Sequence, residues 1–231
     1  MKRQTFLICF TGIDGTGKTT QAKNLVSALK VKGITSRYVW NTYQPILTKP
    51  FLIIAKVLFF RNKDAFQNYI AYTDTKRGLF KNKLLAKAYE CLVLFDYLCR
   101  SFIDIRLPLI FGRSVVSDRY VYDVVVNLAV DLGYSNKASR SLLSKLSRWL
   151  PKPDIAFLID MSEETCYQRK TDVPSIEHLK WRRKIYLNIG KANGVVMLDG
   201  SVNIRELENI IRNKVEQALK STTHLSRRTP V

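Results

Sequence analysis

The stretch G-I-D-G-T-G-K-T at residues 12–19 decides the fold. It fits the pattern G-x-x-x-x-G-K-[S/T], a glycine-rich loop whose backbone N–H groups surround phosphate oxygens. The apolar run T-F-L-I-C-F at 5–10 predicts a buried strand before it, and apolar residues at helical spacing over 18–32 predict a helix after it, ending at Gly33. A glycine turn with an incidental lysine is the alternative, but strand, loop and helix in this order favour a phosphate-binding loop.

Each position of this loop has an expected task. The Lys18 ammonium would reach the β- and γ-phosphates of ATP, and the Thr19 hydroxyl would hold Mg²⁺. The closest match to the guanine motif N-K-x-D is N-K-V-E at 213–216, inside a predicted helix, which argues against a GTPase. The predicted nucleotide-binding residues are Gly12, Ile13, Asp14, Gly15, Thr16, Gly17, Lys18, Thr19 and Thr20.

The remainder of the chain alternates predicted strands with predicted helices. Four further strands are expected at 36–40, 114–117, 155–159 and 195–198. Helices are expected at about 84–105 (ended by Pro108), 120–131, 137–149, after Ser162, 177–190 and 203–219. This alternation predicts an α/β fold with a five-stranded parallel sheet and helices on both faces, whose ligands bind beyond the carboxyl ends of the strands. We expect one domain over residues 1–220 and a basic, disordered tail at 221–231.

A strongly apolar stretch at 51–60 does not fit this alternation. Its ten residues cannot span a bilayer, because a spanning helix needs about 20. A packed helix or hairpin is the favoured interpretation. Contact with a membrane surface is the alternative, because basic residues at 49, 56, 61 and 63 flank or interrupt the stretch.

The composition indicates a globular protein with an excess of positive charge. Thirty-eight Lys and Arg against nineteen Asp and Glu give a net charge of +19. An ordinary basic surface is the first interpretation, a field that attracts anionic substrates the second, and nucleic acid or an acidic membrane the third. The basic residues are spread along the chain without interleaved aromatic residues, so we do not expect nucleic-acid binding.

Cysteine usage and the N-terminus bear on the compartment. The four cysteines form no C-x-x-C pair and stand far from both histidines in sequence, which argues against a zinc site and a disulfide framework. The first apolar run is too short for a secretion signal. We therefore expect a reducing, cytoplasmic compartment.

Several segments together resemble the thymidylate kinase family of nucleoside monophosphate kinases. They are T-G-I-D-G-T-G-K-T-T-Q at 11–21, S-V-V-S-D-R-Y at 114–120, P-D-I-A-F-L-I-D-M-S-E-E at 153–164 and V-V-M-L-D-G at 195–200. The resemblance extends from Thr5 to about Leu219. It implies the three-layer P-loop kinase fold, with a short lid at about 168–176, and ATP-dependent phosphorylation of a nucleoside monophosphate, dTMP above others.

The resemblance also implies roles for individual residues. Asp14 would contact the acceptor sugar, Asp118 would support the Mg²⁺ shell through water, and Arg119, followed by Tyr120, would grip the acceptor phosphate. Arg169, with Lys170, would close over the transferred phosphoryl group, a contribution worth roughly 10³–10⁵ in rate. Some family members carry an arginine inside the phosphate loop, whereas position 15 here is glycine, so the lid must supply that charge.

Structural alternatives accompany these roles. Asp118 and Arg119 could form a surface ion pair, Asp14 could satisfy its own turn, and Arg169 could be a solvated cation at a helix end.

The acceptor region departs from the family pattern. In place of R-E-P-G after the second strand, this chain has W-N-T-Y-Q-P at 40–45. Phe95 and Arg100 are five residues apart, whereas the family places Phe and Arg four apart. Phe95, Tyr97 and Arg100 are candidates for the acceptor pocket, with core packing on a buried helix as the alternative.

The sequence therefore predicts a kinase that uses ATP and Mg²⁺, with a small nucleotide as acceptor. A kinase for another acceptor, a nucleotide-binding module without transferase activity, and a membrane- or nucleic-acid-associated ATPase are the alternatives. A homodimer is expected from the resemblance alone.

Overall fold

The computed structural model describes residues 5–46, 48–50, 53–54, 57 and 69–226, the last six of these by their backbone alone. Most of the apolar stretch at 51–60, and with it the predicted helix or hairpin, lies outside the described residues. Within the described part, no helix combines the length and apolar character needed to cross a membrane.

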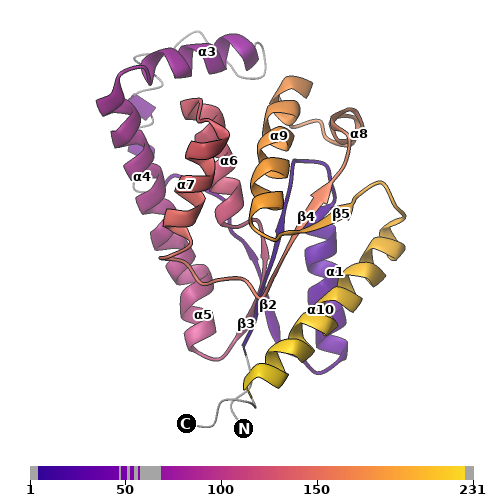
Figure 1. Ribbon diagram of the computed structural model, residues 1–231. Coiled ribbons are helices and arrows are strands. Elements are labelled where there is room, and N and C mark those ends of the chain that lie inside the picture. Colours follow the sequence, from indigo (N-terminus) through magenta and orange to yellow (C-terminus); the bar gives the residue numbers. More distant parts are fainter. Residues whose placement is uncertain (1–4, 47, 51–52, 55–56, 58–68, 227–231) are drawn as a thin grey trace.

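Five parallel strands form the central sheet in the order β2-β3-β1-β4-β5 (Figure 1). Their bounds are Leu7–Thr11 (β1), Ser36–Trp40 (β2), Ser114–Asp118 (β3), Ile155–Asp160 (β4) and Val196–Asp199 (β5). The predicted α/β fold with five parallel strands is confirmed. In the register, Phe10 of β1 lies opposite Asp118 of β3, so the loop that follows β1 starts beside the end of β3. The sheet itself thus brings two predicted site segments together.

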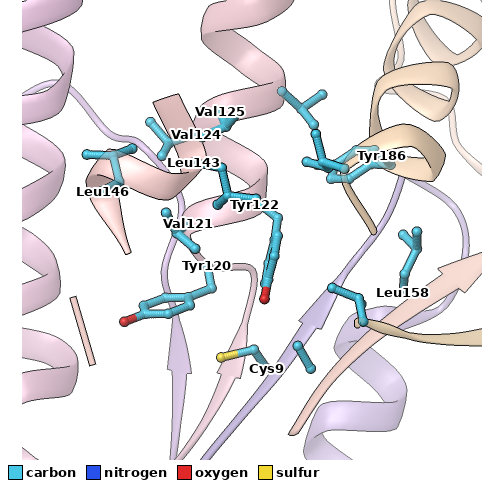
Figure 2. Packing of buried hydrophobic residues seen from close by; sticks show 14 of the residues in the cluster. Cys9, Tyr120, Val121, Tyr122, Val124, Val125, Leu143, Leu146, Leu158 and Tyr186 are labelled. Carbon is cyan, nitrogen blue, oxygen red and sulfur yellow. The ribbon is translucent and has the colours of Figure 1, made fainter. Parts of the chain in front are cut away.

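Alternate residues of β1 enter two different cores. Leu7 and Cys9 join a cluster with helices α4, α6, α7 and α9, whereas Ile8 and Phe10 join a cluster with α1 and α10 on the other face. Figure 2 shows the first cluster, where Cys9 lies below side chains of α6, α7 and α9. The bounds of these helices are Lys18–Val31 (α1), Lys83–Ser101 (α4), Val121–Leu132 (α6), Asn136–Leu146 (α7), Ile176–Ala192 (α9) and Ile204–Ser226 (α10). Helices on both faces of a buried sheet give three layers.

The predicted end of the 84–105 helix at Pro108 is wrong. A π-helical turn, η1 (Phe102–Arg106), follows α4 and leads into α5 (Leu107–Ile110). The Leu107 N–H donates to the Phe102 carbonyl, five residues back, so Pro108 falls in the first turn of a new helical segment. There its missing N–H removes no hydrogen bond.

The helix α4 is buried on one side only. Val93 and Tyr97 are buried, whereas Leu92 and Phe95 are exposed. The helix therefore buries one face on α6 and leaves an apolar face in solvent.

Two helices differ from expectation. The helix α3 (Tyr69–Leu79), which crosses the upper ends of α4 and α6 in Figure 1, was not predicted. The last helix continues to Ser226, into the segment expected to be a tail, because no Gly or Pro interrupts residues 204–226. Residues 227–231 lie outside the described part. The short helix α8 (Glu163–Arg169) ends within the first residues of the predicted lid at about 168–176.

Candidate active site

The loop between β1 and α1 has the backbone of an anion cradle. Gly12, Gly15 and Gly17 have φ angles of 134°, 92° and 86°, which side chains other than glycine rarely adopt. A Cβ on Gly15 would lie 2.6 Å from the carbonyl oxygen of Cys166 in α8. The backbone of α8 thus occupies the space that an arginine at position 15 would need, which is the physical reason why this loop carries none.

Lys18 is the first residue of α1, and its side chain is 4% exposed. Its ammonium donates to the Ile13 carbonyl and, over 3.3 Å, to the Thr16 hydroxyl. Burial, together with the nearby Arg119 charge, lowers the pKa of Lys18 to about 8. The loop therefore holds a cation whose charge is only partly compensated, beside the N-terminus of a helix.

Asp118 accepts two hydrogen bonds on one oxygen and none on the other. Its Oδ2 accepts from the Thr19 hydroxyl at 2.5 Å and from the Tyr38 hydroxyl at 3.0 Å. Its Oδ1 is buried and has no hydrogen-bond partner among the described residues. A free carboxylate oxygen beside a threonine hydroxyl fits Mg²⁺, which prefers one or two protein oxygens and completes its shell with water and phosphate. No group of three or more His, Cys, Asp or Glu in the described part forms a separate metal cluster.

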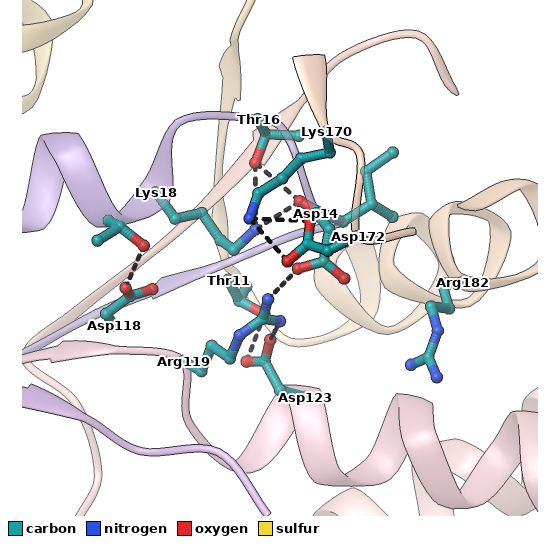
Figure 3. Close-up of polar contacts among 12 residues, drawn as sticks. Thr11, Asp14, Thr16, Lys18, Asp118, Arg119, Asp123, Lys170, Asp172 and Arg182 are labelled. Carbon is teal, nitrogen blue, oxygen red and sulfur yellow. Dashed lines mark hydrogen bonds and ion pairs between the residues drawn. The ribbon is translucent and has the colours of Figure 1, made fainter. Parts of the chain in front are cut away.

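Arg119 lies between two carboxylates (Figure 3). Its guanidinium donates to Asp14 and, at 3.0 Å, to Asp123. Its φ of 75° is the one positive value among the described residues other than glycine. The backbone N–H of Arg119 donates to the Phe10 carbonyl at 2.8 Å, and the Arg119 carbonyl accepts from the Ser117 hydroxyl at 2.6 Å. These two hydrogen bonds hold the unfavourable backbone conformation of Arg119 in place.

Asp123 in α6 collects donors from three other segments. Asp123 is 1% exposed. Its carboxylate accepts from the Thr11 hydroxyl at 2.9 Å, from the Tyr186 hydroxyl at 2.7 Å and from the Tyr120 N–H at 3.0 Å. It also accepts from the Arg119 guanidinium. Sequence reasoning missed this residue and Tyr186, because nothing local marks a carboxylate whose partners lie 63 and 112 residues away.

Asp14 is surrounded by positive charge. Burial would raise the pKa of its carboxyl, but the charges of Arg119, Lys18 and Arg182 outweigh burial and hold the pKa well below its ordinary value. Asp14 is therefore ionised, and it is not a turn residue that satisfies only itself.

One cavity of about 660 Å³ joins these groups to the predicted lid. Its wall contains four cations, at positions 18, 119, 169 and 170, and three carboxylates, at 14, 118 and 172. A concave surface of this size with convergent charges suits a polyanion that brings its own counter-cation. Tyr38 and Trp40, from the edge strand β2, were not predicted for this site. The lining residues are Asp14, Gly15, Gly17, Lys18, Thr19, Thr20, Tyr38, Trp40, Asp118, Arg119, Arg169, Lys170 and Asp172.

Four residues predicted for the acceptor lie elsewhere. Phe95 is 57% exposed, Tyr97 is 1% exposed in the core, and Arg100 pairs with Gln44 and Asp104. The Tyr120 hydroxyl donates to the Pro151 carbonyl at 2.8 Å. None of these four residues lines the large cavity, so their contact with an acceptor stays a prediction.

A second cavity, of about 270 Å³, lies among α3, α4, α6 and α9. Its wall is rich in tyrosine, and it also contains polar side chains of α6 and α9. The lining residues are Tyr43, Tyr69, Tyr72, Thr73, Lys76, Tyr89, Val93, Asn127, Leu128, Asp131, Pro174, His178 and Arg182.

Three known proteins similar to this chain carry related names. A probable thymidylate kinase of Sulfurisphaera tokodaii is 30% identical over 206 residues, covering 87% of this chain and 90% of the relative. The thymidylate kinase of Sulfurihydrogenibium sp. is 27% identical over 220 residues, or 92% of this chain and 97% of that protein. A probable thymidylate kinase of Methanocaldococcus jannaschii is 24% identical over 94% of this chain and 97% of the relative. No protein-family model matches the chain.

Proposed function

Because the chain belongs to the thymidylate kinase family, we propose that it transfers the γ-phosphoryl group of ATP to a nucleoside monophosphate, dTMP. An oxygen of the acceptor phosphate forms a bond to Pγ, the bond from Pγ to the β-phosphate oxygen breaks, and ADP leaves with that electron pair. The observation that carries the proposal is the large cavity, which unites the phosphate loop, a carboxylate with a free oxygen and three further cations.

The protein's contribution is to position two anions and to neutralise them. The amides of the loop and Lys18 bind the β- and γ-phosphates of the donor. Arg119 binds the acceptor phosphate after it separates from Asp14, since a planar guanidinium matches two phosphate oxygens. Thr19 and Asp118 would hold Mg²⁺, which supplies charge neutralisation between the β- and γ-phosphates when bound.

We assign the lid role to Arg169 and Lys170. Both line the cavity, Arg169 as the last residue of α8 and Lys170 directly after it. With glycine at position 15, they are the cations best placed to approach the transferred group. Their closure would also exclude water, which is the competing acceptor.

An acceptor panel with labelled ATP and Mg²⁺ tests the proposal. We expect dTDP from dTMP, formed in step with ADP, and little product from thymidine. Lys18→Ala should lower turnover by at least about 10², because a transition-state cation is lost, while the protein remains folded and keeps a cooperative unfolding transition. Transfer to a different class of acceptor would show that the protein is a kinase for that acceptor. ATP binding without transfer to any acceptor would show that the protein is a nucleotide-binding module without transferase activity.

A homodimer and a cytoplasmic location belong to the same proposal. The continuous rod of α4, η1 and α5 exposes large apolar side chains, including Phe102, Ile103 and Ile110, that a second copy could cover. Sedimentation equilibrium should give twice the mass of one chain, and Phe102→Glu should give the mass of a single chain.

The free cysteines, of which Cys91 and Cys99 are exposed, support a reducing compartment. We expect nucleotides, and not nucleic acid, as partners.

A further inference from the structure

The outer side of α7 carries positive charge only. Residues 137, 140, 141, 144, 145 and 148 are exposed, and their spacing of three or four residues places them on one side of the helix and of the turn that continues it. The charged ones among them are Lys137, Arg140, Lys145 and Arg148, and the others are serines. The fold thus gathers basic residues that are separated in the sequence into one row, which we call the α7 basic face.

No carboxylate compensates this row. The sequence contains no Asp or Glu between Asp131 and Asp154, the acidic residues that flank the helix. Asp131 is paired with Lys76 at 2.7 Å, and Asp154 accepts from the Leu7 N–H at 2.8 Å. Within the part of the chain that the structure describes, the four cations of the α7 basic face form no ion pair. Their charge is therefore available to a partner outside the chain.

A tryptophan lies at the end of the row. Trp149 is 71% exposed, whereas Leu146 and Leu150 beside it are buried. The Trp149 N–H donates to the Leu146 carbonyl at 3.0 Å, and the Trp149 carbonyl accepts from Arg106 of η1 at 3.2 Å, so this turn is held against the neighbouring rod. Figure 1 shows the lower end of α7 near the start of α5. Lys152, also exposed, follows. An exposed indole among cations is typical of a surface that meets the boundary between water and lipid.

The shape of this face favours an extended partner over a small anion. Neither of the two cavities described above is lined by a residue of α7. A row of cations without a pocket is complementary to a surface that carries many negative charges, and each Lys or Arg near an acidic bilayer strengthens binding roughly fivefold. Single-stranded nucleic acid offers similar charge, but proteins that bind it set several aromatic rings along the cations for stacking. Here one ring stands at the end of the row, which favours lipid.

We propose that the α7 basic face, with Trp149 and Lys152 at its end, docks on a bilayer rich in acidic phospholipids. The cations contact the headgroups and the indole lies at the boundary with the acyl chains. The contact is peripheral and weakened by salt, because it depends on charges at the surface. The phosphate loop and the predicted lid belong to other elements, so the docked protein keeps its nucleotide site. This inference goes beyond the proposed function and does not depend on it.

Cosedimentation of the full chain with lipid vesicles tests the inference. Vesicles of phosphatidylcholine with about 30% phosphatidylserine should bind the protein in about 0.05 M NaCl, and binding should be at least about tenfold weaker in about 0.5 M NaCl. Pure phosphatidylcholine vesicles should bind none. The triple variant Arg140→Glu, Lys145→Glu and Arg148→Glu should lower the partition coefficient at least about 100-fold, and Trp149→Ala should lower it about tenfold.

A second triple variant is the matched control. Lys30→Glu, Arg205→Glu and Lys220→Glu change the net charge by the same amount at exposed positions of α1 and α10, which cover the opposite face of the sheet. This variant should bind acidic vesicles within about threefold of the wild type. Calorimetry with ATP and a cooperative unfolding transition show that both triple variants are folded, so that lost vesicle binding is not a result of misfolding.

The outcomes decide between specific docking and its alternatives. The inference is overturned if the wild type does not bind acidic vesicles at low salt. It is also overturned if both triple variants lose binding equally, because net charge alone would then be responsible. Tight binding to duplex or single-stranded DNA that only the α7 variant loses, with no binding to vesicles, would assign the face to nucleic acid and overturn the docking on lipid.

Discussion

ATP binding should draw a proton onto Lys18 at alkaline pH. In the free protein this pKa is about 8, so half of the side chains are neutral at pH 8 and about nine-tenths at pH 9. The β- and γ-phosphates of ATP favour the charged form and raise the pKa above the range of the experiment. Binding should then take up about 0.5 proton at pH 8 and about 0.9 at pH 9.

Calorimetry in buffers with different ionisation enthalpies measures this uptake directly. At each pH, the slope of the apparent binding enthalpy against the buffer's ionisation enthalpy gives the number of protons. The dissociation constant should also rise roughly tenfold between pH 7 and pH 9, which corresponds to about 1.4 kcal/mol. Lys18→Met should bind weakly with a slope near zero. A wild-type slope near zero at pH 9 would refute the reasoning, because it would mean that Lys18 is fully charged before ATP arrives.

The lowered pKa of Lys18 also affects the free energy of unfolding. A lysine with a lowered pKa in the folded state opposes folding below pH 8, where both states carry the proton, and this penalty disappears as pH rises from about 8 to the ordinary lysine value. The full shift is worth about 3 kcal/mol. Lys18→Met should therefore raise the free energy of unfolding of the ATP-free protein at pH 7 by up to about 3 kcal/mol, measured by urea denaturation. A less stable variant would show that the contacts of the ammonium outweigh its burial.

Three further substitutions test single features of the site. Asp123→Asn should lower the free energy of unfolding by about 2–3 kcal/mol, because it weakens a buried ion pair with the Arg119 guanidinium; an unchanged urea midpoint would contradict this. If Arg119 has the proposed role, kcat/KM for the acceptor should also fall at least about tenfold. Gly15→Ala should abolish ATP binding in calorimetry, because the added Cβ would lie 2.6 Å from the backbone of Cys166. Gly194→Ala is the control: Gly194 also has a positive φ, but an added Cβ there meets nothing within 4 Å, so this variant should bind ATP normally. Tyr38→Phe should raise the Mg²⁺ concentration needed for half-maximal activity about tenfold, because it removes a hydrogen bond to the Asp118 carboxylate, which we propose supports Mg²⁺. A change confined to the KM for the acceptor would argue against that role.

Local pattern was sufficient to predict the sheet and the position of the glycine-rich loop. The strand at 36–40, for example, is reproduced by β2, and the phosphate loop begins where the run at 5–10 predicted. Such features depend on neighbours in sequence: apolar runs mark buried parallel strands, and glycine spacing marks a loop that must turn tightly. The π-helical turn before Pro108 was missed, because its register of hydrogen bonds leaves no signature in residue type.

The acceptor side could not be predicted for a different reason. Its side chains come from segments that meet only in the folded chain, as the hydrogen bond between Arg182 and Asn127 across 55 residues illustrates. Arg182 stands among other basic residues of α9, so composition gives no reason to single it out. Its neighbour Arg183 is bound instead to Asp160 and Glu163, outside the cavity. One position along the helix thus separates a structural ion pair from a group that lines the smaller cavity.

The electrostatics of Arg119 link specificity to turnover. In the ligand-free state its charge is balanced by Asp14 and Asp123, so an anion that simply approaches gains little from it. In the proposed reaction, an acceptor phosphate on Arg119 would displace Asp14, which keeps its charge because its pKa is low. That displacement is favourable only if another group compensates Asp14, and the acceptor sugar hydroxyl can do so by donating to it. Inorganic phosphate, which carries no sugar, would leave Asp14 without a replacement for Arg119. Under the proposed function, the pair formed by Asp14 and Arg119 would therefore discriminate a nucleotide from free phosphate.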